Sequence, residues 1–226
     1  MKRIGMVVAL EEEILPLLQN IDVKINRKEA GKFSVAEFTL GDKEIITVKS
    51  GVGEIKGAAA TQYLITEYNP DMIINFGVCG SLSSGLSLKS VVLVSGVVHY
   101  DFDTSAVDDC VVGKYEDYPD VVIKTNENLL NLAKRFFVDA NAVICASADK
   151  FVADPLQKKL LSETYGASVC DMESAGVLIT ADMNDTPTLI VKAVSDGDGG
   201  AAEYRAMVKD ASRQYIDFLL KFAKIV

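Results

Sequence analysis

The sequence predicts an α/β fold, in which helices cover both faces of a central twisted, mixed β-sheet. Short runs of β-branched residues alternate along the chain with helix-like segments, and this alternation is typical of a three-layer α/β/α domain. The segment Lys24–Thr39 has an alternating run and turn glycines, so it is expected to add an antiparallel hairpin. With 226 residues and no abrupt change of composition, residues 1–226 are expected to form one domain.

The individual elements follow from the periodicity of apolar residues. Strands are expected near Ile4–Leu10, Glu44–Lys49, Met72–Phe76, Val91–His99, Ala142–Ala148, Ala167–Cys170 and Thr188–Ala193. Helices are expected near Glu12–Gln19, Glu54–Tyr68, Glu127–Val138, Pro155–Thr164 and Ser174–Met183, with a last one near Ala202–Lys224. The stretch Asp101–Asp120 lacks a clear period, so it is expected to be a long loop with a functional or interface role.

Charge and hydropathy narrow the range of partners. The formal net charge is −9 and the chain has no block of Lys or Arg, which argues against nucleic acid or an anionic membrane as a partner.

The apolar start of the chain runs directly into Glu11 without a small-residue cleavage site, so it is expected to be a strand and not a signal peptide. No apolar stretch approaches the roughly 20 residues that span a bilayer. A cytoplasmic protein is expected.

The four cysteines are widely spaced, with no CxxC pair, and His99 is the single histidine. Zinc binding is therefore not expected. Small buried thiols in a reducing compartment are the simplest interpretation of these cysteines.

Carboxylates follow two apolar strands of the predicted sheet. Asp171 and Glu173 come after one strand, and Asp196 comes after another. Open parallel sheets gather their ligand-binding groups at this edge, to which the acids Glu11–Glu13 after the first strand would also be delivered. The pattern predicts acid/base chemistry on a polar small molecule. Acids in a first helical turn also complement the helix dipole without any function, and Asp196 also fits a surface turn.

Two glycine-containing segments follow strands. In Ser50–Gly53 the third glycine falls at Gly57, one residue too late for a dinucleotide fingerprint, so the segment fits a tight turn beside another ligand. Asn75–Ser81 fits either a plain turn or a close approach to a ligand. Phe151 fits a core aromatic or a platform on which a base stacks.

Taken together and in order, these motifs resemble the nucleoside phosphorylase/nucleosidase superfamily, and most closely its 5′-methylthioadenosine/S-adenosylhomocysteine nucleosidases. The resemblance covers nearly the whole chain through Ala9–Glu13, Lys49–Gly53, Asn75–Gly80, Ser147–Val152, Asp171–Glu173 and Ala193–Asp196. It implies a nucleoside phosphorylase-like fold and a hydrolase that releases adenine from 5′-methylthioadenosine, S-adenosylhomocysteine or both.

The resemblance also implies a role for each matched residue. Glu13 corresponds to the base that activates water, and Asp196, oriented by Ser195, to the acid that serves purine N7. Glu173 corresponds to the ligand of the ribose hydroxyls, with Met172 packing on the sugar. The remaining expected substrate contacts are Leu10, Val52, Val78, Cys79, Gly80, Phe151, Val152 and Asp171. Phe151 is expected to stack on adenine and the backbone of Val152 to read its edge.

The expected chemistry explains these residue types. Adenine leaves poorly as an anion, so a carboxyl group that stays protonated near neutral pH must donate to N7. The sugar then gains oxocarbenium character and water attacks from the opposite face. No metal or organic cofactor is expected. Phosphorolysis is the main alternative, but the matched motifs contain none of the five arginines, and a carboxylate at Glu13 would repel phosphate. A non-catalytic nucleoside-binding protein is the other alternative.

Members of this subfamily pair as homodimers, in which a loop of one subunit closes the 5′-alkylthio pocket of the other. The matching loop here is about Asp101–Pro119. Leu10 and Val52 would supply apolar surface for a thioether, so 5′-methylthioadenosine is expected to be preferred over adenosine.

Overall fold

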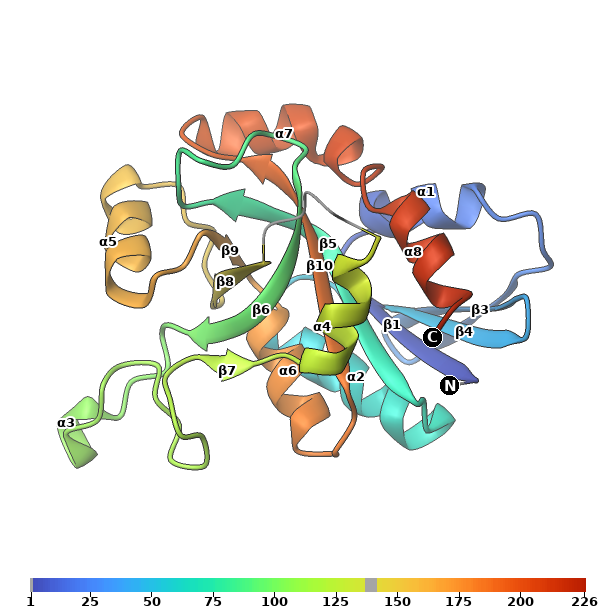
Figure 1. The fold of residues 1–226 in the computed structure, drawn as a ribbon, viewed down its shortest axis with the longest axis horizontal. Helices are drawn as coiled ribbons and strands as arrows, with labels where there is room; N and C mark the ends of the chain where they lie inside the picture. Colours follow the sequence, from blue (N-terminus) through green and yellow to red (C-terminus); the bar gives the residue numbers. More distant parts are fainter. Residues whose placement is uncertain (1, 137–141) are drawn as a thin grey trace.

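The computed structural model describes residues 2–136 and 142–226, and within them it contains a mixed sheet with helices on both faces (Figure 1). The strands are β1 (Arg3–Val8), β2 (Asn26–Ala30), β3 (Phe33–Leu40), β4 (Lys43–Lys49), β5 (Met72–Ser81), β6 (Val91–His99), β7 (Ile123–Lys124), β8 (Ala142–Ser147), β9 (Val169–Asp171) and β10 (Thr188–Asp196). The helices are α1 (Glu11–Gln19), α2 (Glu54–Tyr68), α3 (Ser105–Asp108), α4 (Glu127–Lys134), α5 (Pro155–Tyr165), α6 (Ser174–Asp182), α7 (Gly200–Ala211) and α8 (Ile216–Ala223).

The helices form two layers around the sheet. In Figure 1, α2 and α6 lie below the sheet, while α1, α7 and α8 lie above it. The lower layer buries Val7, Ile73 and Val177 in one hydrophobic cluster. The upper layer buries a second cluster that includes Phe76 and Tyr215. Each face of the sheet therefore has its own core, as the predicted three-layer fold requires.

Strand pairing gives the sheet two parts. The strands β5, β1 and β4 pair in parallel, and the hairpin β2–β3 continues antiparallel from β4. On the other side β5 pairs with both β9 and β10, and the pairings β10–β6, β6–β8 and β8–β9 close a ring. The carboxylates of Asp171 and Asp196 stand at the last residues of β9 and β10, so the ring brings these two strand ends close together.

Several boundaries differ from those expected. β5 and β10 continue through Ser81 and Asp196, so the glycines after Phe76 lie within a strand and do not form a turn. The loop Asp101–Asp120 contains the short helix α3, and β7 was not expected. The expected end of α4 at Val138 lies outside the described residues, whereas the expected hairpin 24–39 is confirmed.

The prediction of a single C-terminal helix is wrong, because the helix is interrupted between α7 and α8. At the break the Ser212 hydroxyl donates to the carbonyl of Val208, and Tyr215 is fully buried. The Tyr215 ring packs edge-on against Phe76 at 5.4 Å, and its hydroxyl donates to the backbone carbonyl of Glu13. Burial of this tyrosine beneath α1 outweighs helix continuity, although the sequence has no Gly or Pro at the break.

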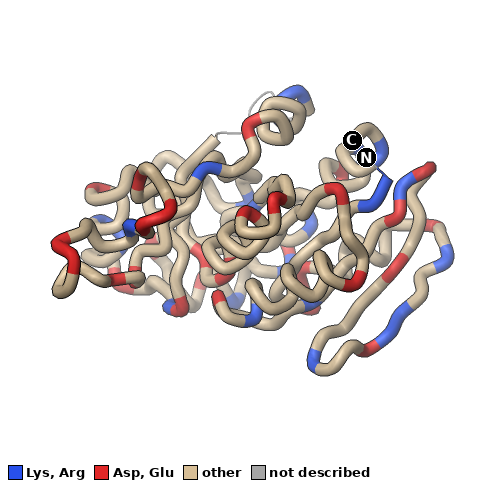
Figure 2. The backbone as a smooth tube through the Cα atoms, turned by 90° about the horizontal axis from the view of Figure 1, so that it is seen from below, with Lys and Arg blue, Asp and Glu red and all other residues tan. Residues whose placement is uncertain are grey.

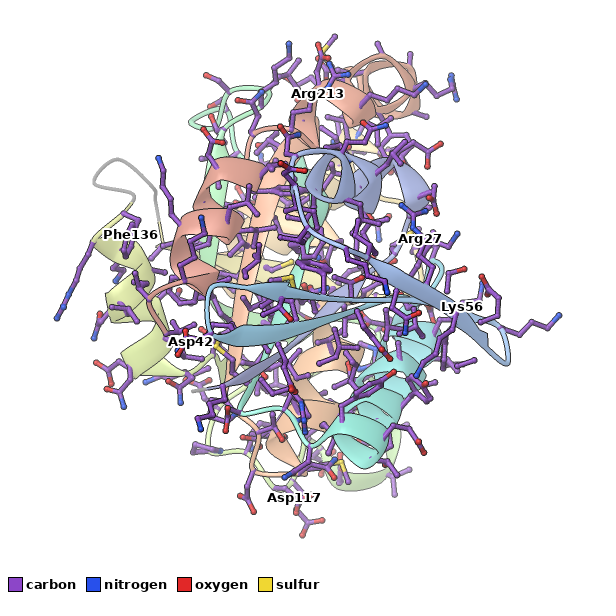
Figure 3. All side chains as sticks on the ribbon, turned by 90° about the vertical axis from the view of Figure 1, so that its right-hand side faces the viewer. Arg27, Asp42, Lys56, Asp117, Phe136 and Arg213 are labelled. Carbon is purple, nitrogen blue, oxygen red and sulfur yellow. The ribbon has the colours of Figure 1, made fainter. Side chains whose placement is uncertain are left out.

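The surface carries both signs of charge. Figure 2 shows acidic and basic residues interspersed along the backbone, without a continuous basic stripe in that view. Charged residues such as Arg213 and Asp117, which are labelled in Figure 3, are exposed. Among the described residues, none of the helices has the length and apolar character needed to cross a membrane.

Candidate active site

A cavity of about 290 Å³ opens where β5, β9 and β10 meet the first turns of α1 and α7. Its volume is close to the lower end of the range for small-molecule sites. Twelve of the thirteen residues expected to touch substrate or catalyse line it: Leu10, Glu13, Val52, Val78, Cys79, Gly80, Phe151, Asp171, Met172, Glu173, Ser195 and Asp196. The fold therefore gathers motifs from across the chain around one space.

The remaining expected residue, Val152, does not line the cavity. Its side chain is buried in a hydrophobic cluster with Leu82 and Val98. A side-chain contact between Val152 and a ligand is thus not available, while the expected contact through its backbone stays a prediction.

Glu13 is the acid of the Glu11–Glu13 run that turns into the protein. Glu11 and Glu12 are exposed, whereas Glu13 is 3% exposed. The N–H of Val78 donates to Glu13 Oε1 at 2.8 Å, and the N–H of Leu10 donates to Oε2 at 2.8 Å. Burial raises the pKa of Glu13, although both N–H groups and the Lys192 ammonium oppose that rise. The two N–H groups hold the carboxylate in a fixed orientation at the cavity wall.

Glu173 immediately precedes α6, and its side chain meets the start of α2. Its Oε1 accepts a hydrogen bond from the N–H of Gly53 at 3.0 Å. Burial, followed by the nearby Asp171 carboxylate, raises the pKa of Glu173 to about 7. The turn at Ser50–Gly53 therefore holds a carboxylate at the cavity wall, and its Val52 lines the cavity.

Asp171 forms a buried ion pair beneath this wall. Its Oδ2 lies 2.7 Å from Lys192 Nζ, and both side chains are 2% exposed. Burial alone would raise the pKa of Asp171, but the ammonium and the hydroxyls of Ser147 and Ser174 hold it below its usual value. Asp171 is thus an ionised partner for Lys192, while its expected contact with substrate stays a prediction.

Asp196 is the carboxylate at the end of β10. The Ser195 hydroxyl lies 2.9 Å from Asp196 Oδ1, and the Lys158 ammonium lies 3.5 Å from Oδ2. Lys158 also donates to the carbonyl of Gly197, which anchors the ammonium. Burial raises the pKa of Asp196, and both Ser195 and Lys158 oppose that rise. The contact from Lys158 was not foreseen, and the orienting role expected of Ser195 stays a prediction.

An aromatic pair forms one wall of the cavity. The rings of Phe151 and Tyr204 pack edge to face, with centroids 5.6 Å apart. Phe151 remains 40% exposed, so a face of its ring is available to a planar ligand. Phe151 is therefore not the ordinary core aromatic that its sequence context also allowed.

The cavity includes residues that the sequence did not single out: Ala9, Cys170, Ala201, Tyr204 and Arg205. Tyr204 and Arg205 lie in the first turns of α7. Their position in the sequence, shortly after Asp196, is the one feature that could have indicated that they line the site. Arg205 matters most, because no arginine was expected at the site. Among the described residues lining the cavity, Arg205 is the one cationic side chain.

Among residues 2–136 and 142–226, no group of three or more His, Cys, Asp or Glu side chains is arranged to hold a metal ion.

The sequence model of the phosphorylase superfamily matches residues 3–226. The chain belongs to the phosphorylase superfamily. This superfamily member is 25% identical over 231 residues to the 5′-methylthioadenosine/S-adenosylhomocysteine nucleosidase of Maridesulfovibrio salexigens, covering 98% of this chain and 99% of that protein. It is 26% identical over 230 residues to the aminodeoxyfutalosine nucleosidase of Campylobacter jejuni, covering 100% of this chain and 95% of that protein.

The solved structures include a futalosine hydrolase of Helicobacter pylori in its native form. It superposes on this superfamily member with a TM-score of 0.94 at 25% identity, covering 100% of this chain and 98% of that one. The predicted nucleoside phosphorylase-like fold is thereby confirmed.

Proposed function

We propose that this N-glycosidic bond hydrolase releases adenine from a 5′-substituted adenosine, with water as the nucleophile. It is a purine nucleosidase of the type shared by the methylthioadenosine and futalosine enzymes. The observation that carries the proposal is the meeting, in one cavity, of two buried carboxylates with raised pKa values, Glu13 and Asp196, beside the partly exposed ring of Phe151.

In the proposed mechanism the two acids act on opposite sides of one bond. The adenine ring stacks on Phe151, and protonated Asp196 donates its proton to N7 as the C1′–N9 bond breaks. The electron pair of that bond leaves with adenine. Positive charge develops on the ribose, whose hydroxyls are held by Glu173. Water then attacks C1′ while ionised Glu13 accepts its proton, so the products are neutral adenine and a 5′-substituted ribose.

The substrate range follows from the apolar part of the cavity. Leu10 and Val52 line it and provide contact surface for a thioether or another apolar 5′ substituent. We therefore propose 5′-methylthioadenosine and S-adenosylhomocysteine as substrates, the former preferred over adenosine, which places the enzyme in methionine salvage. The aminodeoxyfutalosine nucleosidase among the relatives makes futalosine-type nucleosides the substrates to compare.

A homodimer is part of the proposal. Apolar side chains stand exposed near the cavity and on the long loop: Ile55 is 79% exposed, Val107 90% and Val111 65%. The loop is braced by Phe102 and Tyr115, whose rings stack with centroids 3.9 Å apart. A second copy that covers these side chains would bring its Asp101–Pro119 loop to the 5′ end of the cavity. Light scattering after gel filtration tests this assembly.

We also propose a cytoplasmic location. Cys79, Cys145 and Cys170 are buried free thiols, a state that a reducing compartment preserves.

Phosphorolysis remains the second candidate, because Arg205 lines the cavity and a guanidinium binds phosphate well. Hydrolysis is favoured because Arg205 is solvent-exposed, whereas the buried carboxylates of Glu13 and Glu173 would repel a phosphate dianion inside the cavity.

The deciding experiment follows adenine release from 5′-methylthioadenosine with and without phosphate. Equal rates with free 5-methylthioribose as product are expected. Release that requires phosphate and yields a sugar 1-phosphate would replace hydrolysis by phosphorolysis. Tight binding without release would support a nucleoside-binding protein.

A further inference from the structure

Glu54, the first residue of α2, is a buried acid that the proposed mechanism does not use. It is 6% exposed, although acids in a first helical turn are usually solvated. Its Oε2 accepts a hydrogen bond from the N–H of Gly176 at 2.5 Å. Because Gly176 lies in the first turn of α6, this contact ties the start of α2 to the start of α6, directly behind the Gly53–Glu173 contact.

The other carboxyl oxygen of Glu54 is linked to Asp171 through the hydroxyl of Ser147. Ser147 Oγ lies 2.5 Å from Glu54 Oε1 and 2.5 Å from Asp171 Oδ1. A serine hydroxyl has one hydrogen to donate. If both carboxyl groups were ionised, one of these contacts would join two oxygens with no proton between them, which is repulsive at this distance. One of the two carboxyl groups, Glu54 or Asp171, must therefore carry a second proton.

The surroundings of Asp171 decide which acid carries that proton. Asp171 accepts from the Lys192 ammonium, from the Ser174 hydroxyl and from the N–H of Ser174. These donors favour its ionised form. Glu54 has no cationic partner among the described residues, and its Oε1 faces a hydroxyl that can accept. Ser147 then donates to Asp171 and accepts from both Glu54 and the N–H of Ala175, which satisfies its full hydrogen-bonding capacity.

We propose that Glu54 is protonated at neutral pH and acts as a positioning residue, donating through Ser147 to the Asp171–Lys192 pair and holding Glu173 in place for ribose. The catalytic part of this proposal rests on the proposed function, whereas the protonation does not. Burial, followed by the Asp171 carboxylate, raises the pKa of Glu54 to about 8. A neutral Glu54 leaves the Lys192 ammonium to be shared by Glu13, Asp171 and Glu173.

Other groups also face Glu54. The Asp149 carboxylate accepts from its backbone N–H at 2.8 Å, and the phenols of Tyr100 and Tyr115 interact with it electrostatically. Asp171 and Glu173 add negative charge on the α6 side. The Lys192 ammonium, engaged by Asp171, is the opposing positive charge. Ionisation of Glu54 would thus add one more negative charge beside Asp171 and Glu173. The repulsion should displace Glu173 from its position for ribose as pH rises.

Infrared difference spectroscopy with the Glu54→Gln variant tests the protonation. Gln can donate to Ser147 and accept from Gly176, so it reproduces the contacts of the neutral acid. The wild-type minus Glu54→Gln spectrum at pH 7 should contain the carbonyl band of a protonated carboxylic acid, which disappears above about pH 8. The Asp149→Asn control should leave that band in place. A carboxylate band in its stead would show Glu54 ionised and overturn the proposal.

The catalytic part is tested by the ratio of kcat/KM at pH 9 to that at pH 7. The ratio should rise about threefold or more in Glu54→Gln, since Gln does not ionise. An unchanged ratio would remove the positioning role. If wild-type enzyme releases no adenine from any nucleoside, the proposed function fails, and the infrared result still decides whether Glu54 holds a proton.

Discussion

The carboxylate of Glu13 fills the space beside Gly77 that a side chain would otherwise occupy. A β-carbon at Gly77 would lie 2.7 Å from Glu13 Oε1 and 3.2 Å from its Cδ. The glycine of β5 therefore admits a carboxylate from α1 to the sheet, which is how the first helical turn reaches the cavity. The sequence indicated a close approach at these glycines, and the group that approaches is the protein's own acid.

Gly77→Ala is expected to displace Glu13 and to lower kcat by about two orders of magnitude if Glu13 is the base. Overpacking should also cost about 1–3 kcal/mol of stability. Steady-state kinetics and urea unfolding measure the two effects. Gly85→Ala is the matched control, because its β-carbon would meet no atom closer than 3.9 Å. Normal kcat in Gly77→Ala would mean that the orientation of Glu13 is unimportant.

Glu13→Gln tests the base directly. The amide cannot accept a proton from water, so kcat should fall by about 10²–10⁴-fold while nucleoside binding persists. Adenine release and calorimetric binding measure the two properties. Glu12→Gln, which removes an exposed acid of the same helical turn, should retain activity. Equal activities of the two variants would exclude Glu13 as the base.

The two sites of proton transfer also predict a bell-shaped pH profile. Glu13 must be ionised and Asp196 protonated, and burial raises both pKa values. Activity should fall as pH drops through the pKa of Glu13 and also as pH rises through that of Asp196. Asp196→Asn should nearly abolish turnover of adenine nucleosides with the fold intact, whereas the exposed Asp198→Asn should not. Near-normal turnover in Asp196→Asn would remove the acid role.

Local sequence patterns predicted most of the fold because its strands and helices follow apolar periodicity. Patterns failed where tertiary contacts decide. Tyr215 breaks the last helix by packing under α1, and β7 is only two residues long. The candidate site was found through ordered motifs. Lys158 and Arg205 were missed because each lies in a helix outside those motifs, and a buried ammonium on a helix face has no distinctive local pattern.

The missed contact from Lys158 yields a prediction of its own. Its ammonium, 3.5 Å from Asp196 Oδ2, stabilises the ionised carboxylate. Lys158→Met should therefore raise the pKa of Asp196 and shift the alkaline limb of kcat/KM to higher pH. Lys159→Met removes an exposed neighbour that pairs with Glu163 and should leave the limb in place. A limb that moves to lower pH, or does not move, would contradict an acid role for Asp196 under the control of Lys158.

The raised pKa of Glu54 makes the stability of the protein depend on pH. Its pKa is about 8 in the folded protein against 4.5 for the free side chain, so the folded state binds this proton more tightly than the unfolded state does. The tighter binding of this proton stabilises the folded state fully below about pH 4.5, and this contribution is lost as pH rises toward 8. Glu54→Gln has no such proton to lose.

Relative to wild type, Glu54→Gln should therefore gain stability as pH increases, by up to about 1.4 kcal/mol per pH unit within that window. Urea unfolding of both proteins at pH 5, 6.5 and 8 measures this difference in the free energy of unfolding, with Glu12→Gln as the control for loss of an exposed carboxylate. A difference that stays constant across the three pH values would show that Glu54 ionises in the folded protein as it does in the unfolded chain. That result would be incompatible with a shared proton between Glu54, Ser147 and Asp171, because the short contacts on both sides of the serine hydroxyl require it.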